Sequence, residues 1–239
     1  MKAMILAAGL GTRMKPLTDT KPKALIEVAG KTLLEIVIQN LIKYGFDEII
    51  VNVHHFADQI IAFLNRKNSF NIRIEISDES GELLDTGGGL KKASRFFDDG
   101  QPFLVHNVDV ITDMDLSRMM KFHFEKEALV TLAVRKRETS RYLLFDNSMQ
   151  LCGWTNVKTG EVKNAITGRN TDRYAFSGIH IIDPVFFNLV SEKRKFYIID
   201  EYLKLAKNSK IAGFDHSDSL WFDIGKPESL KIVEKLAKV

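Results

Sequence analysis

The sequence contains a single cysteine, Cys152, and no apolar run that approaches the roughly 18 residues needed by a membrane-spanning helix. One thiol excludes an intramolecular disulfide framework and cannot by itself form a zinc site, so we interpret Cys152 as a core thiol. The six histidines do not gather into a metal-binding pattern. The chain begins almost directly in an apolar strand with no leader before it, so we expect a cytoplasmic protein that does not associate with membranes.

The chain also lacks a strong excess of charge of either sign. Lysine and arginine total 34, aspartate and glutamate total 31, and the net charge is +3. This balance disfavours general binding to nucleic acids and favours cations concentrated around a small anionic ligand. Apolar residues make up 45% of the 239 residues, which is enough to bury a full core, and we expect one domain over residues 1–239.

Strand and helix patterns alternate through the first half of the chain. The predicted strands are 3–7, 48–53, 72–77 and 103–106, and the predicted helices are 32–44, 57–67 and 88–97. This alternation predicts an α/β fold with a doubly wound sheet that is mainly parallel. The second half predicts a helix over 115–127, a strand over 128–134, a hairpin over 142–154 that turns at Asn147 and Ser148, and a strand over 173–182. We expect these strands to add antiparallel pairs to the sheet, with a mobile polar loop over 156–171 and closing helices over 197–206 and 227–239.

A glycine turn followed by basic residues lies just after the first predicted strand. Gly9 and Gly11 allow the backbone to bend sharply and to point its N–H groups at an anion without interference from a Cβ. Four cations follow, namely Arg13, Lys15, Lys21 and Lys23. The spacing fits neither the Walker loop, which has four residues between its glycines, nor the dinucleotide fingerprint, which has glycine where Met14 stands. The turn and its cations nevertheless predict a site for a nucleoside triphosphate.

The complete motif resembles the signature of the sugar-1-phosphate nucleotidyltransferases. It reads L-A-A-G-L-G-T-R-M-K-P-L-T from Leu6 to Thr18, with Pro22-Lys23 shortly after it. The resemblance continues over nearly the whole chain, with V-A-G-K-T-L-L at 28–34, L-D-T-G-G-G at 84–89, F-S-G-I at 176–179 and W-F-D-I-G at 221–225. It implies a Rossmann-like mixed sheet of the GT-A-like nucleotidyltransferase type, and the small single-domain members of the family are the most similar.

The resemblance implies that a phosphate oxygen of a sugar 1-phosphate attacks the α-phosphorus of the nucleotide in line and expels pyrophosphate. A phosphate monoester has a second pKa of about 6 and is ionised at neutral pH, so catalysis depends on cations and alignment and does not need a general base. Arg13 is expected to bind the β- and γ-phosphates, and Lys23 to bridge the α-phosphate and the sugar phosphate. The other residues expected to bind the nucleotide are Leu6, Ala7, Ala8, Gly9, Gly11, Thr12, Glu79, Gly87 and Gly88.

Two aspartates are the candidates for a magnesium site. Asp109 follows the predicted strand 103–106, at the end of the strand where ligands bind in open α/β sheets. Asp223 lies in W-F-D-I-G, which resembles the family segment that supplies the second metal carboxylate, although Lys226 replaces the usual threonine. Two carboxylates together with phosphate oxygens and waters suit Mg²⁺ better than a transition metal.

Gly178 and Asn107 are the residues expected on the sugar side of the site. Gly178 matches the sugar-side glycine of the family, whereas the frequent E-K-P motif is absent and Glu161-Val162-Lys163 stands in its region. Val108 also replaces the glycine that usually precedes the metal aspartate. The contacts to the sugar therefore stay open.

The expected function is the Mg²⁺-dependent transfer of a nucleoside monophosphate group to a sugar 1-phosphate, by a monomer or a small homo-oligomer. The preferred substrate pairs are UTP with N-acetylmuramate 1-phosphate, in the supply of cell-wall sugar nucleotides, and GTP with mannose 1-phosphate. The alternatives are a phosphocholine cytidylyltransferase, a glycosyltransferase and a non-catalytic sensor of nucleotide sugars. The missing Asp-x-Asp at 107–109 disfavours the glycosyltransferase, and the presence of Arg13, Lys23, Asp109 and Asp223 together disfavours the sensor.

Overall fold

The structure is a computed structural model that describes residues 1–230 of the chain. These residues form two compact units, each assembled from separate stretches of the sequence. Unit 1 contains Met1–Leu84, Val105–Asp113 and the chain from Leu220 onward, and unit 2 contains Asp85–Leu104 and Met114–Ser219. The expectation of a single domain over residues 1–239 stays a prediction. Within the described residues, no helix is long and apolar enough to cross a membrane.

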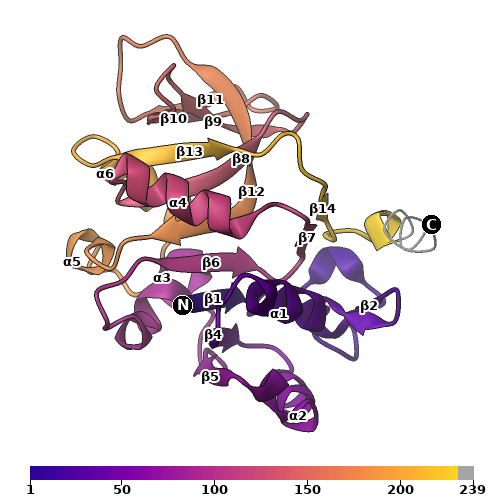
Figure 1. Ribbon diagram of the computed structural model, residues 1–239. Coiled ribbons are helices and arrows are strands. Elements are labelled where there is room, and N and C mark those ends of the chain that lie inside the picture. Colours follow the sequence, from indigo (N-terminus) through magenta and orange to yellow (C-terminus); the bar gives the residue numbers. More distant parts are fainter. Residues whose placement is uncertain (231–239) are drawn as a thin grey trace. The chain divides into compact units, whose positions relative to one another are not determined.

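Unit 1 is built around three parallel strands, β1 (Lys2–Leu6), β4 (Glu48–Val53) and β5 (Arg73–Asp78), which are labelled in Figure 1. Strand β4 pairs with both of the others, so that Leu6 lies opposite Asn52 and Asn52 opposite Ser77. A further strand, β6 (Phe103–Asn107), enters unit 1 at Val105. The three parallel strands end at one edge of the sheet, which is where ligands bind in open α/β folds.

Helices α1 (Leu33–Lys43) and α2 (Ala57–Arg66) connect the parallel strands of unit 1. The hydroxyl of Thr32 accepts a hydrogen bond from the Glu35 amide at 3.1 Å and so caps the start of α1. Just past its end, Gly45 has a φ of +81°, a conformation that glycine adopts without strain. The predicted helices 32–44 and 57–67 are therefore confirmed, with their ends displaced by about one residue.

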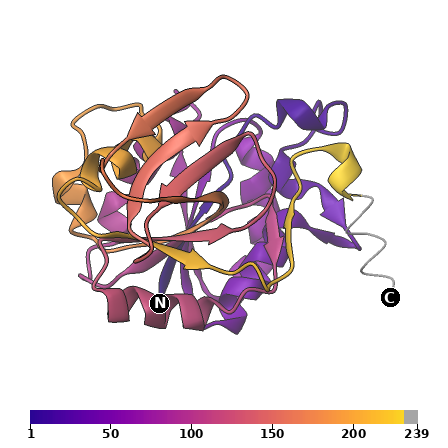
Figure 2. The ribbon, with the colours of Figure 1, turned by 90° about the horizontal axis from the view of Figure 1, so that it is seen from above.

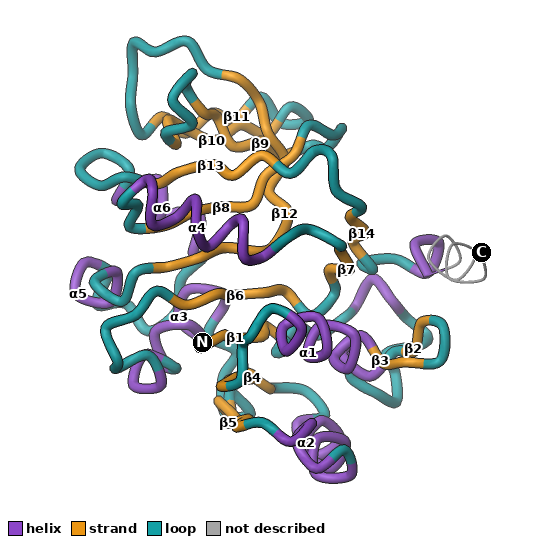
Figure 3. The backbone as a smooth tube through the Cα atoms, in the orientation of Figure 1, coloured by secondary structure: helices purple, strands orange, loops and turns teal. Residues whose placement is uncertain are grey.

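Two short antiparallel pairs in unit 1 were not predicted from the sequence. Strand β2 (Glu27–Val28) pairs with β3 (Lys31–Thr32), and β7 (Val110–Thr112) pairs with β14 (Trp221–Asp223). In Figure 3, β2 and β3 are short orange segments beside α1, and β7 and β14 are short orange segments beside each other. Three 3₁₀ turns, η1 (Thr12–Met14), η2 (Lys23–Leu25) and η3 (Asn68–Asn71), complete the unit. Segments of two to four residues carry too little periodicity to be found from sequence.

Unit 2 contains a mainly antiparallel sheet, which is seen from above in Figure 2. Its strands are β8 (Val130–Arg135), β9 (Arg141–Phe145), β10 (Leu151–Asn156), β11 (Glu161–Asn164), β12 (Asp172–Ile182) and β13 (Ile211–Asp215). The predicted hairpin is β9–β10, and only the β13–β8 pair is parallel among these strands. The loop expected over 156–171 is wrong in part, because Glu161–Asn164 pairs with Gly153–Asn156 as a third strand of this sheet.

Five helical segments belong to unit 2: α3 (Asp85–Lys92), η4 (Ser94–Phe96), α4 (Leu116–Lys126), α5 (Phe186–Leu189) and α6 (Ile198–Leu205). The carboxylate of Asp115 accepts from the Arg118 amide at 3.0 Å and caps α4. Helix α3 begins earlier than the predicted 88–97, so the glycine run lies inside the helix and does not open it. The final predicted helix, 227–239, begins at Pro227, and its part beyond Leu230 lies outside the described residues.

Candidate functional site

The signature turn after β1 depends on one glycine for its shape. Gly11 has a φ of +64° and its carbonyl accepts hydrogen bonds from the Met14 amide at 2.8 Å and the Thr18 hydroxyl at 2.9 Å. A Cβ at this position would come within 2.9 Å of the Thr18 methyl group and 3.3 Å of Lys23 Cβ. The sharp bend predicted for both glycines belongs to Gly11, because Gly9 has no positive φ and its position has room for a Cβ.

Met14 and Ile224 anchor two distant segments in one apolar cluster of unit 1. Both side chains are fully buried, together with Ile26, Val28 and Leu33. The residues immediately before the two anchors, Arg13 and Asp223, are exposed. Gly225 lies beside both, since a Cβ there would be 2.7 Å from Asp223 Oδ1 and 3.2 Å from Arg13 Nη2. The core of unit 1 therefore places the guanidinium of Arg13 and the carboxylate of Asp223 next to the same glycine.

The two predicted metal carboxylates lie beside one strand pair, since Asp109 immediately precedes β7 and Asp223 is the last residue of β14. In the β7–β14 pair, Asp223 lies opposite Val110, and the Ile224 amide donates to the Asp109 carbonyl at 2.8 Å. Asp109 forms an ion pair with the ammonium group of Lys23, and both side chains are largely shielded from solvent, at 22% and 11% exposed. Lys23, Asp109, Asp223 and Arg13, predicted from segments far apart in the sequence, thus lie together within unit 1.

The donor set at this position fits a hard divalent cation. Oxygen ligands from one or two carboxylates, completed by phosphate oxygens and waters, are what Mg²⁺ takes in nucleotide sites. Asp109 already attracts a cationic group, the ammonium of Lys23. Across residues 1–230, no three or more His, Cys, Asp or Glu side chains are grouped so that they could hold a metal ion.

His106 lies on β6, three residues before Asp109. Its ring is buried, and its Nδ1 lies 2.8 Å from the Asn107 carbonyl. Burial lowers the pKa of His106 to about 4, although the nearby Asp109 charge opposes this shift. The imidazole is therefore neutral at pH 7, and the positive charge near Asp109 comes from Lys23 and not from a histidine.

A buried polar pair supports the end of β1, and its member Asn52 is a residue that the sequence analysis does not identify. Asn52 and Glu79 are only 3% and 2% exposed. The Asn52 Oδ1 atom accepts from the amides of Ala7 at 2.7 Å and Ala8 at 3.3 Å, and its Nδ2 donates to Glu79 Oε1 at 2.7 Å. The other carboxylate oxygen of Glu79 accepts from the Leu84 amide at 3.2 Å. Asn52 therefore connects the signature turn to the loop that follows β5.

These bonds bear on three residues predicted to contact the nucleotide. The N–H groups of Ala7 and Ala8 already donate to Asn52, and the Leu6 carbonyl accepts from the Val108 amide at 3.1 Å. Glu79 uses both oxygens internally. The geometry favours a supporting role for Glu79, while its predicted contact with the base stays a prediction. The sequence gives only part of this signal, because Asn52 lies near the end of the predicted strand 48–53 but no local pattern identifies its hydrogen-bond partners.

The remaining predicted residues are placed as follows. Gly87 is buried inside α3, where a Cβ would come within 2.2 Å of the Phe196 ring, so close packing accounts for this glycine. Gly88 is buried in the same helix. Gly178 has a φ of +78° and lies in a bulge of β12, between Phe176 and His180. Asn107 ends β6 and is half-buried in unit 1. Their contacts with ligands stay predictions.

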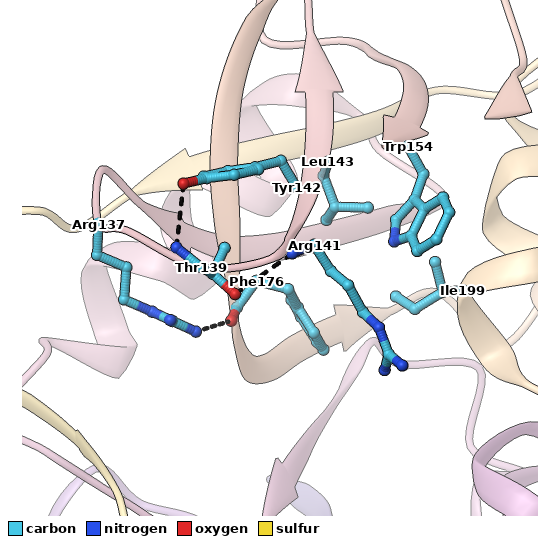
Figure 4. A pocket seen from close by; sticks show the side chains of 8 residues that line it. All are labelled: Arg137, Thr139, Arg141, Tyr142, Leu143, Trp154, Phe176 and Ile199. Carbon is cyan, nitrogen blue, oxygen red and sulfur yellow. Dashed lines mark hydrogen bonds between the residues drawn. The ribbon is translucent and has the colours of Figure 1, made fainter. Parts of the chain in front are cut away.

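Unit 2 contains a pocket of about 200 Å³ on the face of β9, β10 and β12 (Figure 4). Aromatic rings of Tyr142, Trp154 and Phe176 line it, together with Arg137 and Arg141. The Arg137 guanidinium donates to the Phe176 carbonyl at 3.4 Å, and the Tyr142 hydroxyl accepts from the Thr139 amide at 3.0 Å. The sequence analysis did not identify this pocket, because its walls come from strands whose pairing no single segment of the sequence specifies.

Comparison with known proteins gives consistent results. The family model described as "Nucleotidyl transferase" matches residues 2–238. An N-acetylmuramate alpha-1-phosphate uridylyltransferase of Neisseria meningitidis is 33% identical over 99% of this chain and 98% of its own. A UTP--glucose-1-phosphate uridylyltransferase of Synechocystis sp. is 33% identical over 95% of this chain, which spans only 60% of that relative's length.

A solved structure of a putative glucose-1-phosphate thymidylyltransferase of Bacillus anthracis is also similar, with a TM-score of 0.80. The two are 18% identical, and the match covers 100% of this chain and 95% of the other. At this identity the likeness bears on the fold alone. It confirms the predicted α/β fold with a mixed sheet.

Proposed function

This chain belongs to the nucleotidyl transferase family, and on that basis we propose that it transfers a nucleoside monophosphate group from a nucleoside triphosphate to a sugar 1-phosphate. The observation that carries the proposal is the grouping of Arg13, Lys23, Asp109 and Asp223 within unit 1. Two cations and two carboxylates suit the reaction of two polyanions, because the cations offset phosphate charge and the carboxylates hold a compensating metal ion.

We assign the leaving pyrophosphate to Arg13 and the reacting phosphates to Lys23. Arg13 is exposed next to the turn of Gly11, and its planar fork suits bidentate binding of phosphate oxygens. Lys23 is nearly buried and presents a single ammonium group, which suits a point where charge concentrates. An oxygen of the sugar 1-phosphate forms the new bond to the α-phosphorus while the bond to pyrophosphate breaks, and both products remain anionic. Alignment and charge compensation account for the rate enhancement.

Asp109 and Asp223 are the residues that would hold Mg²⁺. The cation would supply positive charge to the triphosphate oxygens, which no neutral residue can provide. The ammonium of Lys23 neutralises the Asp109 carboxylate in the structure. We propose that nucleotide binding separates this ion pair, because phosphate oxygens compete with Asp109 for the ammonium of Lys23.

The names of the relatives suggest two substrate pairs. The relative from Neisseria meningitidis, which this chain matches over 98% of its length, is named for uridylyl transfer to N-acetylmuramate 1-phosphate. The longer relative from Synechocystis is named for uridylyl transfer to glucose 1-phosphate. We propose UTP with N-acetylmuramate 1-phosphate, and a place in the supply of cell-wall sugar nucleotides in the cytoplasm. GTP with mannose 1-phosphate is the second pair to test.

The test is release of pyrophosphate in the presence of Mg²⁺. UTP, GTP, CTP and dTTP are each combined with the 1-phosphates of N-acetylmuramate, mannose and glucose and with phosphocholine. Release with a sugar 1-phosphate supports the proposal, whereas release with CTP and phosphocholine alone assigns the protein to a different substrate class. Nucleotide binding without release under every combination indicates a sensor and contradicts the proposal.

Lys23→Ala tests the assignment at residue level. We expect kcat to fall by about 10²-fold or more, because a cation that meets charge developing in the transition state is lost. Lys31→Ala is the matched control, since Lys31 is an exposed lysine of unit 1 whose ammonium group donates to Gln39 Oε1 at 2.8 Å. Near-normal turnover of Lys23→Ala, or an equal loss in the control, contradicts the role of Lys23.

A further inference from the structure

One long connection in unit 1 carries both of the proposed phosphate-binding cations. It joins β1 to β2 and contains η1, where Arg13 lies, and η2, which begins at Lys23. Between the two 3₁₀ turns, residues 15–22 form turns and bends. A segment without regular backbone hydrogen bonding depends on other contacts for a fixed shape. The position of Lys23 therefore depends on what holds residues 15–22.

The early part of this connection is held from within. The Thr18 hydroxyl donates to the Gly11 carbonyl at 2.9 Å, and Thr18 is only 4% exposed. A Cβ on Gly11 would lie 2.9 Å from the Thr18 methyl group and 3.3 Å from Lys23 Cβ. The Gly11 turn thus packs against both Thr18 and Lys23, so a shift of the chain between these two residues would reach the turn.

The stretch just before Lys23 is held from outside the connection. Gln59, in the first turn of α2, donates from its Nε2 atom to the Thr20 carbonyl at 2.9 Å. Thr20 lies three residues before Lys23, and Pro22 between them has its φ fixed by the ring. An anchor at the Thr20 carbonyl therefore leaves few backbone torsions that can move Lys23.

The start of α2 has a shape that helix stability does not explain. Its N-cap residue is Phe56, which has a φ of +57° and makes no side-chain hydrogen bond to the helix. Ser, Thr, Asp and Asn are the stabilising residues at this position, and the left-handed region is unfavourable for a bulky side chain. The Gln59 amide donates to the Phe56 carbonyl at 3.0 Å. This unfavourable start therefore builds the turn from which Gln59 reaches Thr20, which supports a functional reason for it.

We propose that Gln59 is a positioning residue for nucleotidyl transfer, which anchors the Thr20 carbonyl and thereby places Lys23 for the reacting phosphates. The inference rests on the proposed function, which assigns those phosphates to Lys23. Phosphate oxygens compete with Asp109 for the Lys23 ammonium in that reaction, so an anchor on the backbone matters most when substrate is bound. Without the anchor, the rate falls with the fraction of molecules in which Lys23 is in place. Loss of one neutral hydrogen bond lowers such a fraction about three- to tenfold.

Gln59→Ala and Gln59→Glu test the anchor. Alanine removes the donor, and glutamate keeps the length of the side chain but has an oxygen in place of the N–H donor. We expect both to lower kcat about three- to tenfold while KM for the nucleotide and Tm change little. Asn65→Ala, an exposed amide residue of the same helix, is the matched control and should change none of these values. A loss in Gln59→Glu alone reports its negative charge and overturns the proposal.

A double-mutant cycle separates positioning of Lys23 from general support of the fold. If Gln59 acts through Lys23, Gln59→Ala lowers kcat in the wild type but adds no further loss to Lys23→Ala. In Arg13→Ala the loss should keep its full size, because Arg13 is held at the other end of the connection by its neighbour Met14 in the apolar cluster. Equal losses in all three backgrounds overturn the proposal.

Hydrogen exchange gives a readout that does not depend on turnover. The Ile26 amide, at the end of η2, donates to the Lys23 carbonyl at 3.0 Å. We expect this amide to exchange about three- to tenfold faster in Gln59→Ala than in Asn65→Ala. Unchanged exchange overturns this inference alone, and so does faster exchange with unchanged kcat. Faster exchange in a protein that releases no pyrophosphate with any substrate pair supports the anchor and contradicts the proposed function.

Discussion

Asn52→Ala is the change that most directly tests how the signature turn is held. The side chain is 3% exposed and makes three hydrogen bonds, to the amides of Ala7 and Ala8 and to the carboxylate of Glu79. Truncation leaves two buried N–H groups and a buried carboxylate oxygen without their partner. Each unsatisfied buried group costs about 1–3 kcal/mol, and more when the group is charged. We therefore expect a loss of about 3–5 kcal/mol in the free energy of unfolding.

That loss is large but compatible with a folded protein. Domains have about 5–15 kcal/mol of stability, and about 1 kcal/mol corresponds to about 2–4 °C in Tm for chains of this size. Asn52→Ala should thus lower the Tm by about 10 °C. The amide of Ala7 belongs to the turn that leads to Arg13, so the variant should also raise KM for the nucleotide about tenfold while KM for the sugar 1-phosphate changes little.

A variant that introduces a negative charge at position 52 gives the sharpest control. Asn52→Asp keeps an acceptor for Ala7 and Ala8 but places a second carboxylate against Glu79, which is 2% exposed. Two buried like charges repel, so this single variant should be the least stable. Adding Glu79→Gln restores a donor toward position 52 and keeps an acceptor for Leu84, so Tm and nucleotide KM should recover.

Asn65→Ala on the exposed face of α2 serves as the neutral comparison. The reasoning is refuted if Asn52→Ala matches this control in Tm and nucleotide KM. It is also refuted if the double variant is no better than Asn52→Asp, because the hydrogen-bond pattern would then not be what the residues supply.

Two further predictions concern the metal and the pH dependence. Asp223→Asn removes one carboxylate beside Asp109. The Mg²⁺ concentration for half-maximal pyrophosphate release should therefore rise about tenfold or more. If a metal titration gives the same half-maximal Mg²⁺ concentration as for the wild type, Asp223 is not a metal ligand. His123 is buried in α4 with its Nδ1 2.9 Å from the Thr131 hydroxyl, and burial lowers its pKa from 6.5 to about 4. As the pH falls, the His123 imidazole takes up a proton in the unfolded chain before it does so in the folded chain. The contribution of neutral His123 to the free energy of unfolding is therefore constant above about pH 6.5 and is lost as the pH falls toward 4. Between pH 7 and 5, wild type should lose about 2 kcal/mol more unfolding free energy than His123→Gln, measured by urea denaturation, and parallel pH profiles would contradict the shift.

The elements that could be predicted are those whose signals are local. Helix α1 has a capping threonine at its start and a glycine with positive φ past its end, and both are visible in the sequence. The β9–β10 hairpin has strands on each side of a polar turn. The β7–β14 pair has no such signal, because its strands are three residues long and its partners lie far apart in the chain. The sequence predicts a loop at Glu161–Asn164 for a related reason, since all four residues are exposed at the edge of the sheet and show no apolar alternation.

The residues of the candidate site likewise differ in whether a local sequence signal identifies them. Arg13, Lys23, Asp109 and Asp223 were found because the motif that contains each residue resembles a known signature. Asn52 could not be found in this way, because its role depends on which residue lies opposite the end of β1. A shift of one residue in the β1–β4 register would turn the Asn52 side chain to the other face of the sheet. The pocket of unit 2 required the pairing of β9, β10 and β12, which likewise no single segment specifies.

Stability and function share residues in unit 1. Met14 and Ile224 are buried in one cluster, and each is preceded by an exposed charged residue of the candidate site, Arg13 or Asp223. Large-to-small changes at such anchors cost about 2–5 kcal/mol because they leave a cavity. They would also shift the charged neighbour, since each buried side chain packs the adjoining backbone into the apolar cluster. A loss of activity in a core variant of this unit therefore reports displacement of the site as well as instability, and only variants on the exposed side, such as Asp223→Asn, separate the two.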